Sequence, residues 1–141
     1  MDYRRFNDTY VVRIERGEEV VSKLTSVCEA EGIKLASIEG LGAADYVVMG
    51  LYSVEEKLYH KTTLSGEEFE VCSILGNVSE KDGKPYLHMH ICVAGADGIA
   101  RGGHLNECRI SGACEMFLRR LDGHVGRMQD PATGLNIYSF D

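Results

Sequence analysis

Segments suited to β-strands recur along most of this chain, and only one stretch has the residue spacing of a helix. Runs rich in β-branched and aromatic residues, each with turn signals beside it, predict strands at residues 9–15, 33–41, 44–53, 58–64, 68–77, 86–94, 99–105 and 135–140. The apolar segment 108–121 allows either a helix or a strand, and we favour a strand. The short glycine-rich link between 33–41 and 44–53 predicts that these two strands form an antiparallel pair.

The predicted helix spans residues 18–31. Its apolar residues recur at helical spacing: Val20, Val21, Leu24, Val27 and Cys28. Glu18 and Glu19 suit the positive N-terminal end of a helix, and Gly32 suits its C-terminal end. Packing this helix on one face of a mostly antiparallel sheet gives an α+β architecture. The length of 141 residues fits one domain, residues 1–141.

Composition narrows the classes of function that this chain can serve. A formal net charge of −7 argues against autonomous DNA binding, which draws most of its affinity from neutralised phosphates. The five cysteines are odd in number and form no Cys-x-x-Cys motif, so we expect no disulfide framework and a reducing cytoplasm. No apolar segment follows Arg4-Arg5, and the longest apolar stretch, residues 46–52, is too short to cross a bilayer. We therefore expect no signal peptide and no membrane span.

Two histidines share one face of the strand predicted at 86–94. Side chains alternate along a strand, so His88 and His90 point the same way, about 6.6 Å apart. The turn that follows places His104. A three-residue loop over residues 96–98 would set His90 opposite His104, with Gly98 in the left-handed region. A two-residue loop would set Ile91 opposite His104, and a bulge at Gly102-Gly103 would then be needed.

Three imidazoles that converge from neighbouring strands are a known zinc geometry, in which the fourth position is left to water or substrate. The sequence therefore predicts that His88, His90 and His104 bind a divalent metal, with zinc as the expected ion. The competing interpretation is a hydrogen-bonded histidine cluster in a subunit interface. His60 and His124 lack such a context and are expected to be solvated or singly hydrogen-bonded.

Several further residues are weaker candidates for this region. Cys92 shares the face of the two strand histidines, although a small buried side chain is the simpler interpretation. Glu39 and Glu107 could orient an imidazole or act as a general acid or base, although solvated carboxylates are the simpler interpretation. Arg101 could pair with a carboxylate of a substrate, although a solvated arginine near a turn is again simpler.

The segment from His88 to Leu105 resembles the core of the PPC (plants and prokaryotes conserved) domain. It contains the succession His-x-His, Asp97-Gly98 and Gly-Gly-His, and residues 66–71 are similar to the family's Gly-Arg-Phe-Glu-Ile-Leu region. The resemblance covers most of the chain. It implies a sheet-and-helix subunit assembled as a homotrimer, with a metal, usually assigned as zinc, on the three histidines. It also implies a DNA-binding function, which is the one assigned to bacterial and archaeal members of the family. The chain departs from the family in lacking an Arg-Gly-Arg-Pro hook and in having Glu68 where the family has a basic residue before Phe69.

Two functions fit these observations. The first is a PPC-type homotrimer with a regulatory, DNA-associated role and a metal or small ligand at the histidines. Its contact with DNA would need a DNA-bound partner or a local basic patch. The alternative is a zinc-dependent enzyme, decarboxylase-like or hydrolase-like, that acts on a small oxo- or hydroxy-acid. The expected fold also resembles that of acetolactate decarboxylase, whose zinc is held by three histidines in a similar arrangement.

Overall fold

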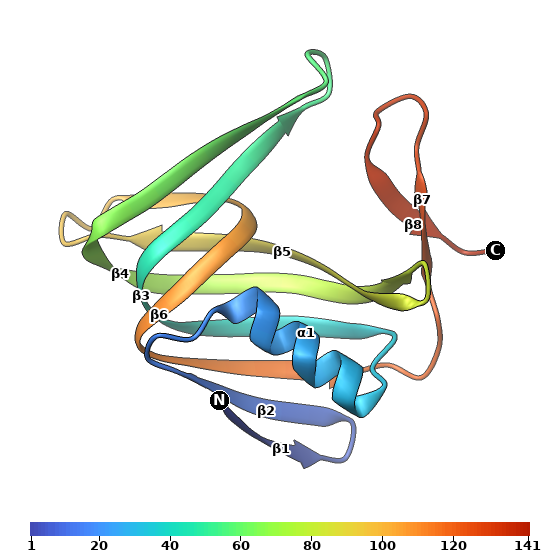
Figure 1. Cartoon of the computed structure of the whole chain (residues 1–141), viewed down its shortest axis with the longest axis horizontal. Coiled ribbons are helices and arrows are strands. Elements are labelled where there is room, and N and C mark those ends of the chain that lie inside the picture. The colour runs from blue at the N-terminus through green and yellow to red at the C-terminus, as the bar shows by residue number, and fades with distance from the viewer.

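The computed structural model describes all 141 residues and contains one helix and eight strands. The elements are β1 (Asp2–Phe6), β2 (Thr9–Glu15), α1 (Val20–Glu31), β3 (Ala36–Ser53), β4 (Leu58–Lys81), β5 (Lys84–Ala94), β6 (Ala100–Arg120), β7 (Gly126–Gln129) and β8 (Asn136–Ser139). Six strands form one antiparallel sheet in the order β1-β2-β6-β3-β4-β5, and β5 also pairs with β6. The predicted antiparallel sheet with one main helix is therefore confirmed (Figure 1).

Three strands are much longer than predicted. Residues 33–41 and 44–53 do not form an antiparallel pair, because β3 runs through both segments as one strand. Its register shifts between Gly40 and Gly42 and again between Ala44 and Tyr46, so the glycine-rich link is a bulged bend instead of a turn. A Cβ atom on Gly42 would lie 2.7 Å from the Cα atom of Cys114, so this glycine serves the close approach of β6.

β4 likewise joins the segments predicted as 58–64 and 68–77, and β6 joins 99–105 with 108–121, where the strand interpretation is confirmed. Residues 100–104 of β6 pair with β5, residues 104–120 pair with β3, and residues 113–119 also pair with β2. This double pairing closes one end of the sheet on itself. The far ends of β3 and β4 form a hairpin that extends from the body (Figure 1).

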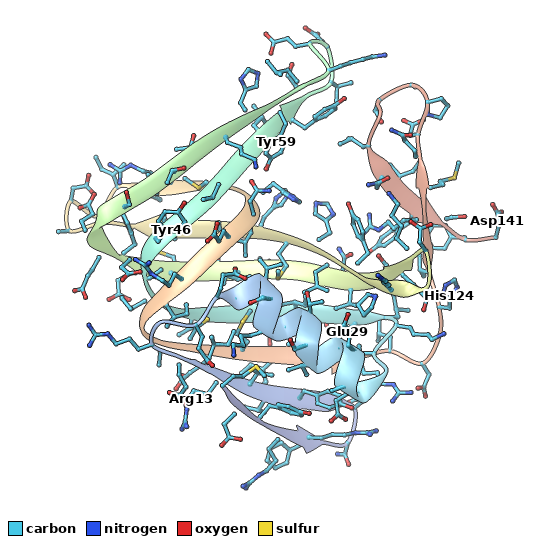
Figure 2. All side chains as sticks on the ribbon, in the orientation of Figure 1. Arg13, Glu29, Tyr46, Tyr59, His124 and Asp141 are labelled. Carbon is cyan, nitrogen blue, oxygen red and sulfur yellow. The ribbon has the colours of Figure 1, made fainter.

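The helix lies across one face of the sheet and covers the main core (Figure 1). It begins two residues later than predicted, because Glu19 is its N-cap and accepts hydrogen bonds from the backbone N–H groups of Val21 and Ser22. It ends at Gly32, whose φ of 61° is left-handed, as predicted. Its buried residues are Val20, Leu24, Val27 and Cys28. Glu29 is exposed on its outer surface (Figure 2).

Two elements were not predicted from the sequence. β1 adds an edge strand beside β2, and β7 pairs with β8 in a separate two-stranded sheet. The predicted strand at 135–140 corresponds to β8. This C-terminal hairpin stands beside the end of the sheet at which β4 turns into β5 (Figure 1). No helix is both long and apolar enough to cross a membrane.

Candidate metal site

The turn between β5 and β6 sets the register that unites the histidines. The N–H of Gly98 donates to the carbonyl of Gly95 at 2.9 Å, and Gly98 has a left-handed φ of 70°. In the resulting pairing His90 lies directly opposite His104. This is the register that the three-residue loop predicted, so the alternative with Ile91 opposite His104 is wrong.

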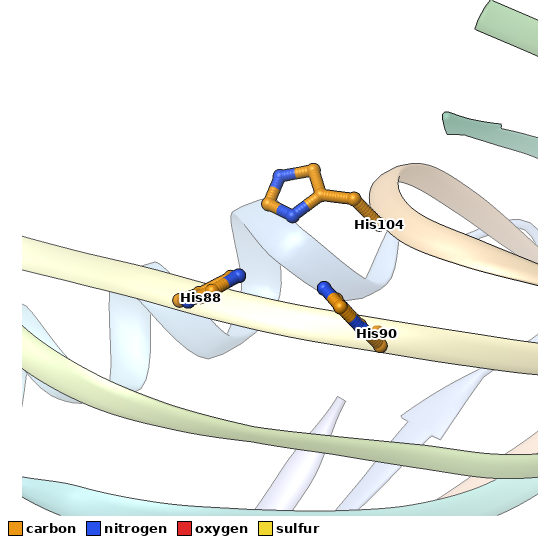
Figure 3. A group of neighbouring side chains, drawn as sticks. All are labelled: His88, His90 and His104. Atoms are coloured by element: carbon orange, nitrogen blue, oxygen red, sulfur yellow. The ribbon is translucent and has the colours of Figure 1, made fainter. Parts of the chain in front are cut away.

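The structure brings His88, His90 and His104 to one point. One nitrogen from each ring can be chosen so that all three lie within 4.8 Å of one another. The ring centroids are 5.2 Å apart for His88 and His90, 5.2 Å for His88 and His104, and 5.7 Å for His90 and His104. Figure 3 shows ring nitrogens of all three residues turned toward a shared space.

This donor set fits zinc. Zinc–nitrogen bonds are about 2.0–2.1 Å long, so two imidazole nitrogens on one tetrahedral ion lie about 3.3 Å apart. Small rotations of the side chains cover the difference from the present spread. Three neutral imidazoles on a rigid strand pair would leave a fourth position for water or a ligand.

The environment of the site favours neutral imidazoles. Burial, followed by the charges of His104, His90 and Arg127, lowers the pKa of His88 to about 4. Burial, followed by the charge of His90, lowers the pKa of His104 below its ordinary value of 6.5. Only a neutral imidazole can ligate a metal, so these two ligands do not need to lose a proton near neutral pH.

Two side chains from other elements lie beside the histidines and were not predicted from the sequence. Tyr59, on the hairpin of β3 and β4 (Figure 2), contacts the His104 ring edge-on with a centroid distance of 6.2 Å. Its hydroxyl donates to Asn106 Oδ1 at 2.7 Å. Arg127 of β7 donates from Nη2 to Asn77 Oδ1 at 2.8 Å, and Asn77 is the strand partner of His88. Neither residue carried a sequence signal, because both reach the site only through tertiary packing.

Neither the other two histidines nor Cys92 joins this cluster. His60 lies 2.7 Å from Glu56 on the hairpin of β3 and β4, and His124 lies 3.2 Å from Glu80. Cys92 has a free thiol, is partly buried and lies two residues after His90 on β5. It is not one of the three clustered side chains.

The charged candidates also lie outside the cluster. Glu39 shares the face of His90 but stands on β3, two strands away, or about 10 Å. Glu107 is exposed and is not part of the histidine group. Arg101 pairs with Asp97 at 3.0 Å and lies opposite Val93, so it faces away from His104. Cavities of about 270, 450 and 320 Å³ also lie elsewhere, and no histidine lines them.

Comparison with solved structures gives close relatives over nearly the full chain. A protein from Bacteroides thetaiotaomicron, described as a "putative DNA binding protein", is 32% identical, with a TM-score of 0.95 over 99% of this chain and 96% of its own. A metal-containing protein from Archaeoglobus fulgidus is 35% identical, with a TM-score of 0.88 over 99% of both chains. A plant- and prokaryote-conserved (PPC) protein from Pyrococcus horikoshii is 34% identical, with a TM-score of 0.87 over 98% of this chain and 93% of its own.

The likeness to acetolactate decarboxylase is one of fold alone. The enzyme from Bacillus subtilis is 13% identical, with a TM-score of 0.56, and the match covers 88% of this chain and 57% of that one. Comparison with curated protein sequences gave no match. The family model of the Plants and Prokaryotes Conserved domain, abbreviated PCC or PPC, matches residues 1–122. This chain therefore belongs to the Plants and Prokaryotes Conserved domain family.

Proposed function

We propose that this PPC-domain protein binds one divalent metal ion, zinc, per subunit through His88, His90 and His104. The observation that carries the proposal is the convergence of three imidazole nitrogens within 4.8 Å on the rigid pair of β5 and β6. The metal-containing relative from Archaeoglobus fulgidus supports it. Bound zinc would supply a Lewis acid with a free coordination position.

Metal analysis tests this proposal directly. The purified protein, examined by mass spectrometry for metals, should contain close to one zinc ion per chain. Metal-stripped protein should bind zinc with the same stoichiometry in isothermal titration calorimetry. A wild-type protein that binds no zinc near one ion per subunit would refute the site.

The proposed assembly is a homotrimer. Its support within the chain is an exposed row on the sheet face opposite α1, here called the apolar row, in which apolar side chains flank the carboxylate of Glu39. Leu75 and Phe117 are 59% and 44% exposed there, on either side of Glu39, and Leu41 nearby is 57% exposed. Exposed apolar clusters of this kind are typical of subunit interfaces. The row runs from β6 across β3 and β4 to His90 on β5, so assembly would enclose the metal site from one side.

The proposed biological role is regulatory and DNA-associated, in the cytoplasm. The relative from Bacteroides thetaiotaomicron supports the association with DNA, whereas the net charge of −7 opposes unaided binding to a polyanion. A DNA-bound partner protein would reconcile the two. The free thiols of all five cysteines agree with a reducing compartment.

A zinc-dependent enzyme acting on a small oxo- or hydroxy-acid is the second candidate. It is favoured by the donor set, because three protein ligands with an open position are the arrangement of catalytic zinc. Zinc-loaded protein incubated with a panel of such acids should then release carbon dioxide or a hydrolysis product. No turnover with any member of the panel would leave the metal-binding role and remove the enzymatic one.

A further inference from the structure

Arg127 is a partly buried cation without an anionic partner. Its Nε donates to Ser79 Oγ at 2.8 Å, Nη1 to the carbonyl of Asn136 at 3.0 Å, and Nη2 to Asn77 Oδ1 at 2.8 Å. All three acceptors are neutral, and Arg127 forms no ion pair. Five arginines elsewhere lie within 4 Å of a carboxylate: Arg13, Arg101, Arg109, Arg119 and Arg120. The other three without an ion pair, Arg4, Arg5 and Arg16, are exposed to water, whereas Arg127 is partly buried.

The guanidinium is held in place by two aromatic rings as well. Its carbon lies 4.8 Å from the ring centroid of Tyr86 and 4.3 Å from that of Tyr138. These cation–π contacts and the three hydrogen bonds fix the group, and two of its five N–H groups remain available. A fixed arginine loses little conformational entropy when it binds an oxyanion.

Arg127 lies on the same sheet face as the metal site. Along β4, Asn77 and Ser79 carry side chains to one face, and their strand partners on β5 are His88 and Tyr86. Directly paired residues have Cβ atoms about 5 Å apart, so the guanidinium on Asn77 stands beside His88.

With zinc bound, the site would carry a net positive charge that favours an anionic ligand. Zinc carries two positive charges, the three imidazole ligands are neutral, and Arg127 adds a third positive charge. No carboxylate contacts Arg127 or belongs to the ligand cluster. A ligand with a negative oxygen would interact with both centres at once.

From this juxtaposition we infer that Arg127 binds the anionic group of a small carboxylate ligand held at the metal. The inference rests on the proposed metal site and names the class of ligand which that site takes. Arg127 lies on β7, beyond the residues 1–122 that match the family model. Its role is that of a ligand-binding residue, not of a metal ligand.

The test uses zinc-loaded full-length protein and isothermal titration with pyruvate as the carboxylate probe. Methyl pyruvate, which lacks the charge, and inorganic phosphate are the comparison ligands. Wild type should bind pyruvate more tightly than either. Arg127→Gln should weaken pyruvate binding at least about tenfold, since a charged hydrogen-bonded contact is lost. Arg127→Lys keeps the charge, so its affinity for pyruvate should lie between those of wild type and Arg127→Gln. It provides the test if the glutamine variant does not fold.

Lys81→Met is the matched control. Lys81 also anchors the C-terminal hairpin, donating to Asn136 Oδ1 at 3.1 Å, but it lies four residues beyond Asn77, about 13 Å farther along the strand. Its loss should leave pyruvate affinity unchanged. Zinc content is measured for every variant, so absence of zinc in wild type refutes the proposed metal site and not the role of Arg127. With zinc bound, the inference is wrong if Arg127→Gln binds pyruvate as wild type does, or if methyl pyruvate or phosphate binds as tightly as pyruvate.

Discussion

His90 and His104 lie directly opposite each other on β5 and β6, with ring centroids 5.7 Å apart, although fourteen positions separate them in the chain. The pairing is antiparallel and next to a short turn, so the two imidazoles have little freedom to separate. His88 lies two residues before His90 on β5, on the same face, and adds the third ring. The predictions below follow from this arrangement and from the face of the sheet on which it lies.

Each of the three histidines should be required for zinc. His88→Ala, His90→Ala and His104→Ala should each lower zinc affinity by more than about 100-fold, because loss of an outer hydrogen-bond partner alone costs about 10–100-fold. Isothermal titration of metal-stripped variants measures this loss. His60→Ala and His124→Ala are the controls and should bind as wild type does. Equal weakening by His60→Ala would contradict the assignment.

Acid should destabilise the metal-free protein through His88. Its folded pKa is about 4, whereas an unfolded histidine has a pKa of about 6.5. Between these values the unfolded state binds the extra proton, so the free energy of unfolding falls as the pH drops from 6.5 toward 4. Urea unfolding of chelator-treated protein at pH 7 and pH 5 measures the fall. In His88→Gln, whose side chain cannot be protonated, the free energy of unfolding should fall less between these two pH values. An equal fall in wild type and variant would refute this cause.

The apolar row should mediate assembly. Light scattering coupled to size-exclusion chromatography should give about three times the 15.6 kDa subunit mass for wild type. Leu75→Lys and Phe117→Lys should produce smaller species, because each buries a charge in the proposed interface. Phe140→Lys, at an 82% exposed position outside the row, is the control. A wild-type monomer at micromolar concentration would exclude the trimer.

Gly42 should be intolerant of a side chain. A Cβ atom there would lie 2.7 Å from the Cα atom of Cys114, and backbone on a paired strand cannot move away cheaply. Gly42→Ala should therefore lower the free energy of unfolding by about 1–3 kcal/mol. Gly112→Ala is the control, because its nearest neighbour would be Ala43 Cβ at an ordinary 3.6 Å. Similar urea midpoints for the two variants would contradict this account.

The isolated chain should bind duplex DNA only weakly at physiological salt. Counterions are released from DNA when basic side chains neutralise its phosphates, and a chain with a net charge of −7 offers little such neutralisation. Its affinity for DNA should therefore be no better than ordinary non-specific binding, about 10⁻⁴–10⁻⁶ M. A gel-shift assay at 150 mM salt measures this. Nanomolar, sequence-specific binding by the chain alone would show that no DNA-bound partner is needed.

The sequence by itself determined the fold class, the helix and the histidine pair. Two-residue alternation around His88 and His90 is a local property of a strand, and the cap at Gly32 is local to the helix. The residues of the turn at Gly98 narrowed the position of His104 to two registers. Local patterns are informative wherever the relevant partners are close in the chain.

Only the tertiary structure decided the rest. Gly40-Leu41-Gly42 has the composition of a turn, yet β3 continues through it, because pairing with β4 and β6 on both sides stabilises an extended, bulged backbone. Arg127 and Tyr59 reach the histidines from segments 39 residues after His88 and 45 residues before His104. No periodicity within either segment encodes that proximity, because it arises from how the two hairpins pack against the sheet.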